Sequence, residues 1–253
     1  MKQIEIYLLF KLLFYKVELI MERIDKIIAT QTNYSRKEVK KLVQQKRVQV
    51  NGVLIYKSDI KIDEKNDRIE LDGNEINIKK YVYLILNKPK GYISATKDKD
   101  TLTVLDLVPK EYSHRNLFPA GRLDKDTTGM MIITDDGEFA HNILAPKKHI
   151  KKAYNVEIDI PINDKMINGF EIGVKLNDGI CKNAILDKID EKIAKVVLTE
   201  GRYHQIKRMF GCFGAKVINL ERIAMGNLEM PKDLKKGECR ELTIEELEKI
   251  KEK

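Results

Sequence analysis

Hydrophobic residues recur at helical spacing in two short segments near the start of the chain. The apolar positions of these segments are Ile24, Ile27, Ile28, Val39, Leu42 and Val43. Apolar residues three and four positions apart share one face of a helix, so each segment predicts a short amphipathic helix. The second helix should begin after Ser35, because Glu38 follows it at the spacing of a capping box.

Two extended runs then surround Asn51-Gly52. Residues 48–53 read VQVNGV, and Asn-Gly between short apolar runs is the strongest local signal of a β-hairpin. Residues 57–80 are highly charged with few apolar positions, and we expect them to complete a small sheet and lead onward. The pattern therefore predicts a compact unit of two helices and a small sheet over residues 21–79.

From residue 80 to residue 253 the pattern changes to apolar runs typical of strands. These runs lie at residues 81–87, 130–134, 154–160, 195–199 and 216–220. Short helices are expected at residues 103–108, after Asp135-Asp136-Gly137, and at residues 204–213. Strands joined by hairpins and long loops, with few helices, predict an α+β domain built on a mixed, mainly antiparallel sheet.

The net charge of the chain indicates which kind of binding partner to expect. The 253 residues carry a formal net charge of +8, which favours an anionic partner such as nucleic acid. Residues 34–49 hold one acid and six basic residues, and the six are Arg36, Lys37, Lys40, Lys41, Lys46 and Arg47. We expect this basic face to contact RNA phosphates, with an affinity that falls steeply with salt. The alternative is a solvated helix face that binds nothing.

The cysteines and histidines argue against a metal site. Cys181, Cys212 and Cys239 form no C-x-x-C pair, which fits a reducing cytoplasm and argues against a disulfide framework. The four histidines show no spacing typical of metal ligands. Cys212 lies on an apolar helical stretch beside Met209 and Phe213, so we expect it in the core.

Residues 1–20 contain apolar stretches that Lys11 and Lys16 interrupt. No run approaches the roughly 20 residues that span a bilayer, and a secretory signal would need a longer apolar centre. The helical spacing of the apolar residues also permits a surface helix. Because Met21 begins a complete module, we interpret the segment as an upstream extension or an overlong gene call.

Two motif blocks carry the candidate chemistry. Residues 121–129 read GRLDKDTTG, and residues 200–210 read EGRYHQIKRMF. With LNKPKGY at residues 86–92 and the closing LERIAMGNL and GECRELT segments, the chain resembles the RsuA/RluB family of ribosomal RNA pseudouridine synthases. The combination of DTTG with GRYHQIKRMF is closest to the small-subunit (16S) branch of that family. The helix, basic residues and V-x-V-N-G order from Arg23 to about Ile69 resembles the S4 RNA-binding domain.

The resemblance implies an isomerase that requires no redox cofactor and no metal. Pseudouridine formation breaks the N1–C1′ bond of a uridine, turns the uracil and rejoins it through C5. By resemblance, Asp124 is the nucleophile, attacking either the sugar or the ring, and Lys207 is the cation that opposes its desolvation. Tyr154 matches the tyrosine that stacks on the uracil and is a candidate for taking the C5 proton. Arg122 matches the arginine that helps displace the base, and Arg202 is expected to contact RNA.

Without the resemblance, the same residues have plainer interpretations. Asp124 would be a turn aspartate, Lys207 a solvated helix lysine and Tyr154 an ordinary core aromatic. His204 and Gln205 are expected to orient the start of their helix rather than to carry protons.

Three other functions stay open on the sequence. Residues 124–135 partly fit a calcium loop, although Asp135 replaces the glutamate expected at the twelfth position and Pro119 and Gly121 disfavour an entering helix. The others are a non-catalytic S4 protein that escorts ribosomal RNA and a synthase for large-subunit (23S) RNA. The sequence favours a cytoplasmic monomer, with no membrane partner, that isomerises one uridine of 16S ribosomal RNA. Because the base must be extruded, we expect its substrate to be a partly assembled small subunit.

Overall fold

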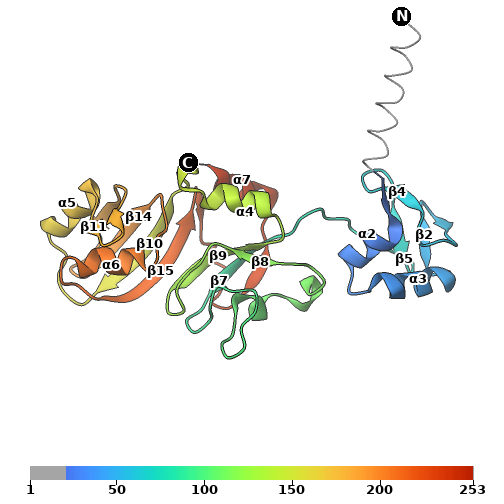
Figure 1. The fold of residues 1–253 in the computed structure, drawn as a ribbon, viewed down its shortest axis with the longest axis horizontal. Coiled ribbons are helices and arrows are strands. Elements are labelled where there is room, and N and C mark those ends of the chain that lie inside the picture. The colour runs from blue at the N-terminus through green and yellow to red at the C-terminus, as the bar shows by residue number, and fades with distance from the viewer. Residues whose placement is uncertain (1–20, 253) are drawn as a thin grey trace, which may run out of the picture. The chain divides into compact units, whose positions relative to one another are not determined.

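The computed structural model describes residues 21–252 (Figure 1). Within them the chain forms two compact units, one of residues 21–80 with 110–116 and one of residues 81–109 with 117–252. The segment at residues 110–116 therefore belongs to the first unit, although the sequence analysis assigned it to the second domain.

The first unit packs two helices against two small sheets (Figure 1). The helices are α2 (Ile24–Gln31) and α3 (Arg36–Gln44), with a 3₁₀ turn η2 (Lys110–Tyr112). One sheet pairs β1 (Met21–Arg23) with β4 (Lys61–Asp63). The other has the order β3 (Val53–Leu54), β2 (Val48–Val50), β5 (Ile69–Leu71) and β6 (Asn74–Glu75). The apolar stripes of both helices are buried in one core with these strands, as predicted.

Local sequence sets two boundaries in this unit. Ser35 caps α3, because its Oγ accepts a hydrogen bond from Glu38 N at 3.3 Å while Glu38 Oε2 accepts one from Ser35 N at 2.7 Å. The predicted hairpin turn is also present. Asn51 and Gly52 both have positive φ, 52° and 78°, the conformation that joins two twisted strands in a two-residue turn.

The second unit is built on a nine-stranded sheet with the path β13-β14-β10-β15-β9-β7-β17, while β16 pairs with β15 and β8 with β9. The strands are β7 (Tyr83–Lys88), β8 (Phe118–Ala120), β9 (Thr128–Thr134), β10 (Lys152–Ile158), β13 (Ile185–Lys188), β14 (Ile193–Leu198), β15 (Val217–Met225), β16 (Leu228–Glu229) and β17 (Cys239–Glu241). Only the β9–β15 pair in this sheet is parallel. The mixed, mainly antiparallel sheet confirms the predicted α+β class.

Short helices and one small hairpin complete the second unit. They are η1 (Val104–Leu107), α4 (Gly137–Leu144), η3 (Pro146–Lys148), α5 (Asp164–Ile172), α6 (Gln205–Gly211), α7 (Ile244–Lys251) and the hairpin of β11 (Lys175–Leu176) with β12 (Gly179–Ile180). Residues of α4 and α7 share one apolar cluster with β7 and β9, so both helices cover the same part of the sheet (Figure 1).

Gly129 allows β9 to approach β15. Its φ is +98°, and a Cβ at this position would lie 2.2 Å from the carbonyl oxygen of Arg222. The close approach permits the parallel pairing of Thr128 with Glu221 and of Gly129 with Arg222. It thereby fixes the loop before β9 next to β15.

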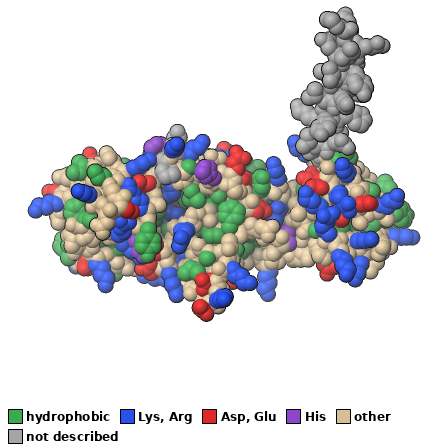
Figure 2. Space-filling view, in the orientation of Figure 1, with side chains coloured by type: hydrophobic (Ala, Val, Ile, Leu, Met, Phe, Trp, Pro, Cys, Tyr) green, Lys and Arg blue, Asp and Glu red, His purple; other side chains and the backbone are tan. Residues whose placement is uncertain are grey.

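Lys and Arg side chains are spread over the visible surface of both units (Figure 2). Between residues 21 and 252, every helix is too short or too polar to cross a bilayer. Residues 1–20, interpreted above as an upstream extension, lie outside the described residues.

Candidate active site

A cavity of about 750 Å³ opens in the second unit. Its lining comes from the loop at residues 121–127, from β10 and β15, from residues 93–95 and from residues 201–206, which include the start of α6. Its volume lies in the range of pockets that hold small ligands, and it brings both motif blocks to one place.

Asp124 lies in this cavity between two basic side chains. Its Oδ2 is 3.3 Å from Nζ of Lys207, and its Oδ1 is 3.3 Å from Nε2 of His204. The structure therefore brings together the two residues that the sequence analysis paired. The contact with His204 was not predicted, since this histidine was expected only to orient the start of its helix.

Lys207 has a second and shorter contact that was not predicted. Its Nζ lies 2.7 Å and 2.8 Å from the two carboxylate oxygens of Asp126. The hydrogen bond from Lys207 outweighs burial and lowers the pKa of Asp126. Burial opposes the charge of Lys207, but its hydrogen bonds with Asp126 and Asp124 prevail and raise its pKa. The ammonium thus stays charged between two carboxylates.

A buried lysine holds the loop that carries Asp124. The side chain of Lys88, at the end of β7, is fully buried. Its Nζ donates to the carbonyl oxygens of Thr127 (2.7 Å), Asp124 (3.0 Å), Pro89 (3.2 Å) and Lys125 (3.3 Å). Burial lowers its pKa to about 8, although the nearby carboxylates of Asp126 and Asp124 favour the charge. In the sequence this lysine was singled out only as part of the LNKPKGY segment, and its role in holding the loop was not predicted.

Tyr154 lies on β10 with its side chain largely buried against the cavity. It pairs with Arg222 across the β10–β15 ladder and follows Lys152 by two residues. Because alternate residues of a strand share a face, all three side chains lie on the face that lines the cavity. The tyrosine was predicted as a site residue, whereas Lys152 and Arg222 were not.

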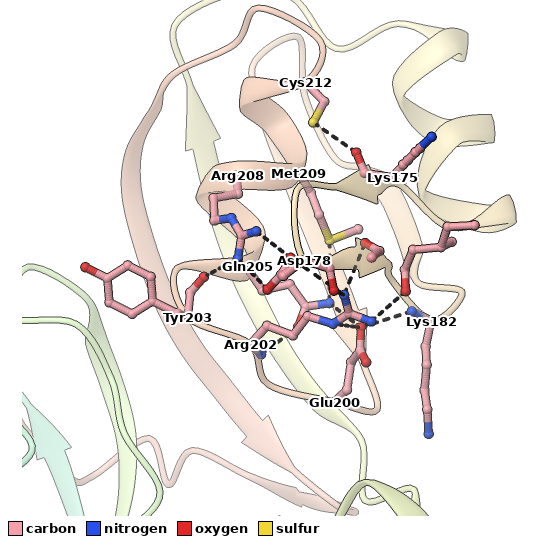
Figure 3. Close-up of polar contacts among 12 residues, drawn as sticks. Lys175, Asp178, Lys182, Glu200, Arg202, Tyr203, Gln205, Arg208, Met209 and Cys212 are labelled. Carbon is pink, nitrogen blue, oxygen red and sulfur yellow. Dashed lines mark hydrogen bonds and ion pairs between the residues drawn. The ribbon is translucent and has the colours of Figure 1, made fainter.

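A network of charged side chains fixes the segment before α6 (Figure 3). Gln205 accepts a hydrogen bond from the backbone N of Arg202 at 2.9 Å and donates one to Glu200 at 2.7 Å. Arg208 donates to both carboxylate oxygens of Asp178, at 3.1 Å and 2.5 Å, and to the carbonyl of Tyr203 at 3.1 Å. Gln205 therefore orients the start of α6, as predicted.

The side chain of Arg202 is engaged by contacts within the protein. Its guanidinium donates to the carbonyl oxygens of Gly179 at 3.2 Å and Ile180 at 2.5 Å, and its Nε lies 3.4 Å from Glu200 (Figure 3). Arg122, by contrast, is exposed at the cavity lining. The two arginines assigned to RNA contact or base displacement thus differ in their freedom to move.

Tyr203 and His204 form a stacked pair at the cavity. Their ring centroids are 3.8 Å apart with an interplanar angle of 19°, and Tyr203 is 73% exposed. In Figure 3 the tyrosine ring points away from the cluster around Arg202 and Arg208. His204 has a positive φ of 47°, so backbone strain accompanies its placement against Asp124.

The predicted basic face in the first unit divides into paired and unpaired residues. Arg36 donates to both carboxylate oxygens of Asp25, at 3.0 Å and 3.1 Å, and Arg47 to both of Asp72, at 2.7 Å and 2.6 Å. The four lysines of this face are exposed without an ion pair among the described residues, and they are Lys37, Lys40, Lys41 and Lys46. The lysines are therefore the side chains left available to a partner.

The prediction that Cys212 is a core residue was wrong. The buried residues of α6 are Gln205, Ile206, Met209 and Phe210, and Cys212 falls beside that stripe at the end of the helix. The thiol is exposed, and its Sγ lies 3.7 Å from the carbonyl oxygen of Lys175 (Figure 3).

Comparisons with known proteins match both units. Residues 82–211 match a family model described as RNA pseudouridylate synthase, and residues 22–69 match the S4 domain. The chain is 39% identical over 230 residues to an uncharacterized RNA pseudouridine synthase of Aquifex aeolicus, covering 90% of this chain and 96% of the relative. It is 37% identical over 231 residues to ribosomal small subunit pseudouridine synthase A of Escherichia coli K12, covering 90% and 99%. A crystal structure of a pseudouridylate synthase superposes with a TM-score of 0.64 at 33% identity, covering 90% and 99%.

Proposed function

Because this chain belongs to the RNA pseudouridine synthase family and is therefore an isomerase, we propose that Asp124 is the nucleophile with which it converts one uridine of 16S ribosomal RNA. The observation that carries this proposal is the 3.3 Å contact between Asp124 and Lys207 within the cavity. The ammonium fixes the direction of the carboxylate and leaves it facing the space where a base would enter.

The reaction places few demands on the site beyond position and charge. The N1–C1′ bond of the uridine breaks, the ring turns, and C5 bonds to C1′, so the product has the composition of the substrate. A carboxylate nucleophile attacks either the sugar or the ring, and both routes begin with Asp124 beside an extruded base. Tyr154, on the wall of the same cavity, would stack on the uracil and is the candidate for taking the C5 proton.

RNA contacts would come from both units. Arg122, exposed at the cavity lining, would displace the base and hold the RNA backbone. Arg202, which also lines the cavity, would add an RNA contact. The exposed lysines of α3 would bind phosphates of structured RNA through the S4 domain. A non-catalytic S4 protein is not retained, because the larger unit belongs to an enzyme family.

The small ribosomal subunit is the favoured source of the substrate. The Escherichia coli relative named for that subunit is 37% identical and is covered over 99% of its length, which supports a 16S target over a 23S target. Extruding a base costs a few kcal/mol, more if it is paired. We therefore propose a cytoplasmic monomer that acts on a partly assembled small subunit.

A tritium-release assay tests this function. RNA carrying uridine tritiated at C5 loses tritium when C5 forms its new bond, so small-subunit and large-subunit RNAs are assayed separately. We expect release from the small-subunit RNA by the parent and none by Asp124→Asn, which should still fold and bind RNA. Asp187→Asn, at an exposed position of β13, is the matched control and should retain parent activity. Activity of Asp124→Asn near the parent rate would refute the assignment, and release only from large-subunit RNA would refute the 16S target.

A further inference from the structure

Two buried cations on the cavity wall have no carboxylate partner within the part of the chain that the structure describes. Lys152 is 6% exposed and Arg222 is 2% exposed, and both line the cavity next to Tyr154. Among residues 21–252, no Asp or Glu side chain lies within ion-pair distance of either. Each electrostatically disfavours the other, because they lie close enough for Arg222 to lower the pKa of Lys152 beyond the effect of burial.

Strand pairing fixes the positions of these cations. Lys152 and Tyr154 are two residues apart on β10, and Arg222 of β15 lies directly opposite Tyr154. The β10–β15 register shifts between Ala153 and Tyr154, and such irregularities redirect side chains near active sites. The tyrosine proposed to stack on the uracil is therefore flanked by both cations.

Hydrogen bonds within the protein do not use the full capacity of either group. Nζ of Lys152 donates to the carbonyl oxygen of Ile150 at 3.1 Å, whereas the ammonium of Lys88 has four carbonyl acceptors. Arg222 donates from Nε to the carbonyl oxygen of Met130 at 2.6 Å and makes a weak contact with the sulfur of Met131. An ammonium has three N–H donors and a guanidinium has five, so several donors lack an acceptor among the described residues.

Such an arrangement destabilises the folded protein unless a ligand offsets it. Burying a charge without a partner costs several kcal/mol, and two like charges at one wall add to that cost. A purely structural role explains the hydrogen bond from Arg222 to β9. It does not explain why the charged side chain of Lys152 is buried with a single carbonyl acceptor. A ligand with negative charge at the cavity wall would satisfy both groups.

We propose that Lys152 and Arg222 bind the carbonyl edge of the extruded uracil and stabilise the negative charge of the ring after its glycosidic bond breaks. This inference rests on the proposed function. When the N1–C1′ bond breaks, its electron pair stays on N1 and spreads onto the O2 and O4 oxygens. The two cations keep their protons and donate hydrogen bonds to those oxygens. The charge leaves the ring when C5 bonds to C1′, and this step displaces Asp124 if its carboxylate has bonded to the sugar. Tyr154, the candidate base, then takes the C5 proton, and N1 gains a proton from water, so the product has the composition of the substrate.

The decisive variant is Lys152→Met, which removes the charge and keeps the length of the side chain. We expect its single-turnover tritium release to fall by about 10²–10³-fold, the usual effect of losing one donor to a developing oxyanion. The RNA Kd should change by less than about threefold, because the charge arises only during the reaction. The melting temperature at pH 7 should rise, since an unpaired buried charge is gone. Lys152→Arg should recover part of the rate, and Lys151→Met, at the exposed neighbouring position, is the matched control with parent activity.

Other results would overturn the inference. If Lys152→Met releases tritium at the parent rate, Lys152 has no role in the reaction. A melting temperature lower by about 4 °C or more, which is roughly 1–2 kcal/mol for a protein of this size, would make the lysine structural. If the cations instead bind a phosphate, Lys152→Met would weaken the Kd and flatten its salt dependence by about one unit of slope. Arg222→Lys gives a second measurement, and we expect slower release at an unchanged Kd.

Different results would contradict the proposed function and this inference. If Asp124→Asn stays active or the parent releases no tritium from either RNA, the proposed function is wrong and the inference falls with it. If the parent is active, Asp124→Asn is inactive and Lys152→Met matches the parent, only the inference is wrong.

Discussion

The ammonium of Lys207 makes its shortest ion pair with Asp126, at 2.7 Å, rather than with the proposed nucleophile. Asp124 lies farther from the same nitrogen, at 3.3 Å. Two acidic residues of the GRLDKDTTG block therefore share one cation, and they differ in exposure, because the side chain of Asp126 is 69% exposed and that of Asp124 is 24% exposed. The more buried carboxylate faces the cavity, and the more exposed one anchors the lysine.

Substitution of these two aspartates should separate the roles. We expect Asp126→Asn to slow single-turnover tritium release by less than about tenfold, or about 1.4 kcal/mol, because Lys207 keeps Asp124 as a partner. Asp124→Asn should abolish release. Rates of both variants under saturating enzyme provide the measurement. Equal losses from the two substitutions would contradict the assignment of Asp124 as the single nucleophile.

Gly129 should be intolerant of a side chain. Gly129→Ala adds a Cβ 2.2 Å from the Arg222 carbonyl oxygen at a φ of +98°. We expect the free energy of unfolding to fall by about 2–4 kcal/mol, because both the backbone conformation and the β9–β15 contact must adjust. Urea unfolding monitored by circular dichroism measures this change. Gly137→Ala, at the start of α4 with no atom within 4 Å of the added Cβ, is the control and should be close to neutral.

Local sequence signals predicted the parts of the fold and site that depend on neighbouring residues. The capping box at Ser35, the Asn51-Gly52 turn and the buried β9 strand are set within a few residues. Asp124 and Lys207 were paired through the family resemblance that the two motif blocks carry, since neither block alone indicates the contact. Their geometry then follows from the fold that the family shares.

Other parts depend on contacts between distant segments. The placement of Lys152 beside Arg222 requires the β10–β15 ladder, and no local pattern distinguishes these residues from surface cations. Helix α7 was missed because its sequence IEELEKIK is mostly charged and contributes one fully buried side chain, Ile250. The contact of His204 with Asp124 depends on a positive φ that a residue type other than glycine rarely adopts.

Burial of Lys152 should give the protein a measurable pH dependence. Burial and the neighbouring Arg222 lower its pKa from 10.5 to about 8. Below about pH 8 the ammonium is charged in both the folded and unfolded states, so its burial lowers stability by about 3 kcal/mol. Between pH 8 and about 10.5 the unfolded state binds more protons, and this contribution to the unfolding free energy therefore rises with pH. Arg222 on β15 is the charged group facing it, and Tyr154 lies beside it on β10.

Comparison with Lys152→Met isolates this effect. The variant should be more stable than the parent at pH 7, and the difference in unfolding free energy should shrink as the pH rises from 8 to 10. Urea unfolding at several pH values measures it, with Lys151→Met as the control. Tritium release by the parent should also decline above about pH 8, and Lys152→Arg should move that decline to higher pH. A stability difference that is constant with pH would show that Lys152 is not held charged in a buried site.

The S4 domain offers a prediction about RNA affinity. Lys40, Lys41 and Lys46 are exposed without ion pairs among the described residues, whereas Arg36 and Arg47 are held by Asp25 and Asp72. Replacing the three lysines with glutamine should weaken RNA binding and flatten the plot of log K against log salt by about two to three units. The reason is that each lysine bound to a phosphate releases close to one counterion. Fluorescence anisotropy with ribosomal RNA fragments between about 50 and 200 mM salt measures the slope.

A charge-matched control variant makes that result specific. Replacing Lys57, Lys61 and Lys65 with glutamine changes the net charge of the same unit equally, at exposed positions outside the basic face. This control should keep the parent slope, because a diffuse change in net charge displaces no counterions from the RNA. If both variants flatten the slope equally, binding responds to the overall charge and the basic face does not contact phosphate. If neither variant flattens the slope, the RNA is held by the catalytic unit alone. The rate of tritium release at saturating RNA should then be the same for the parent and both triple variants.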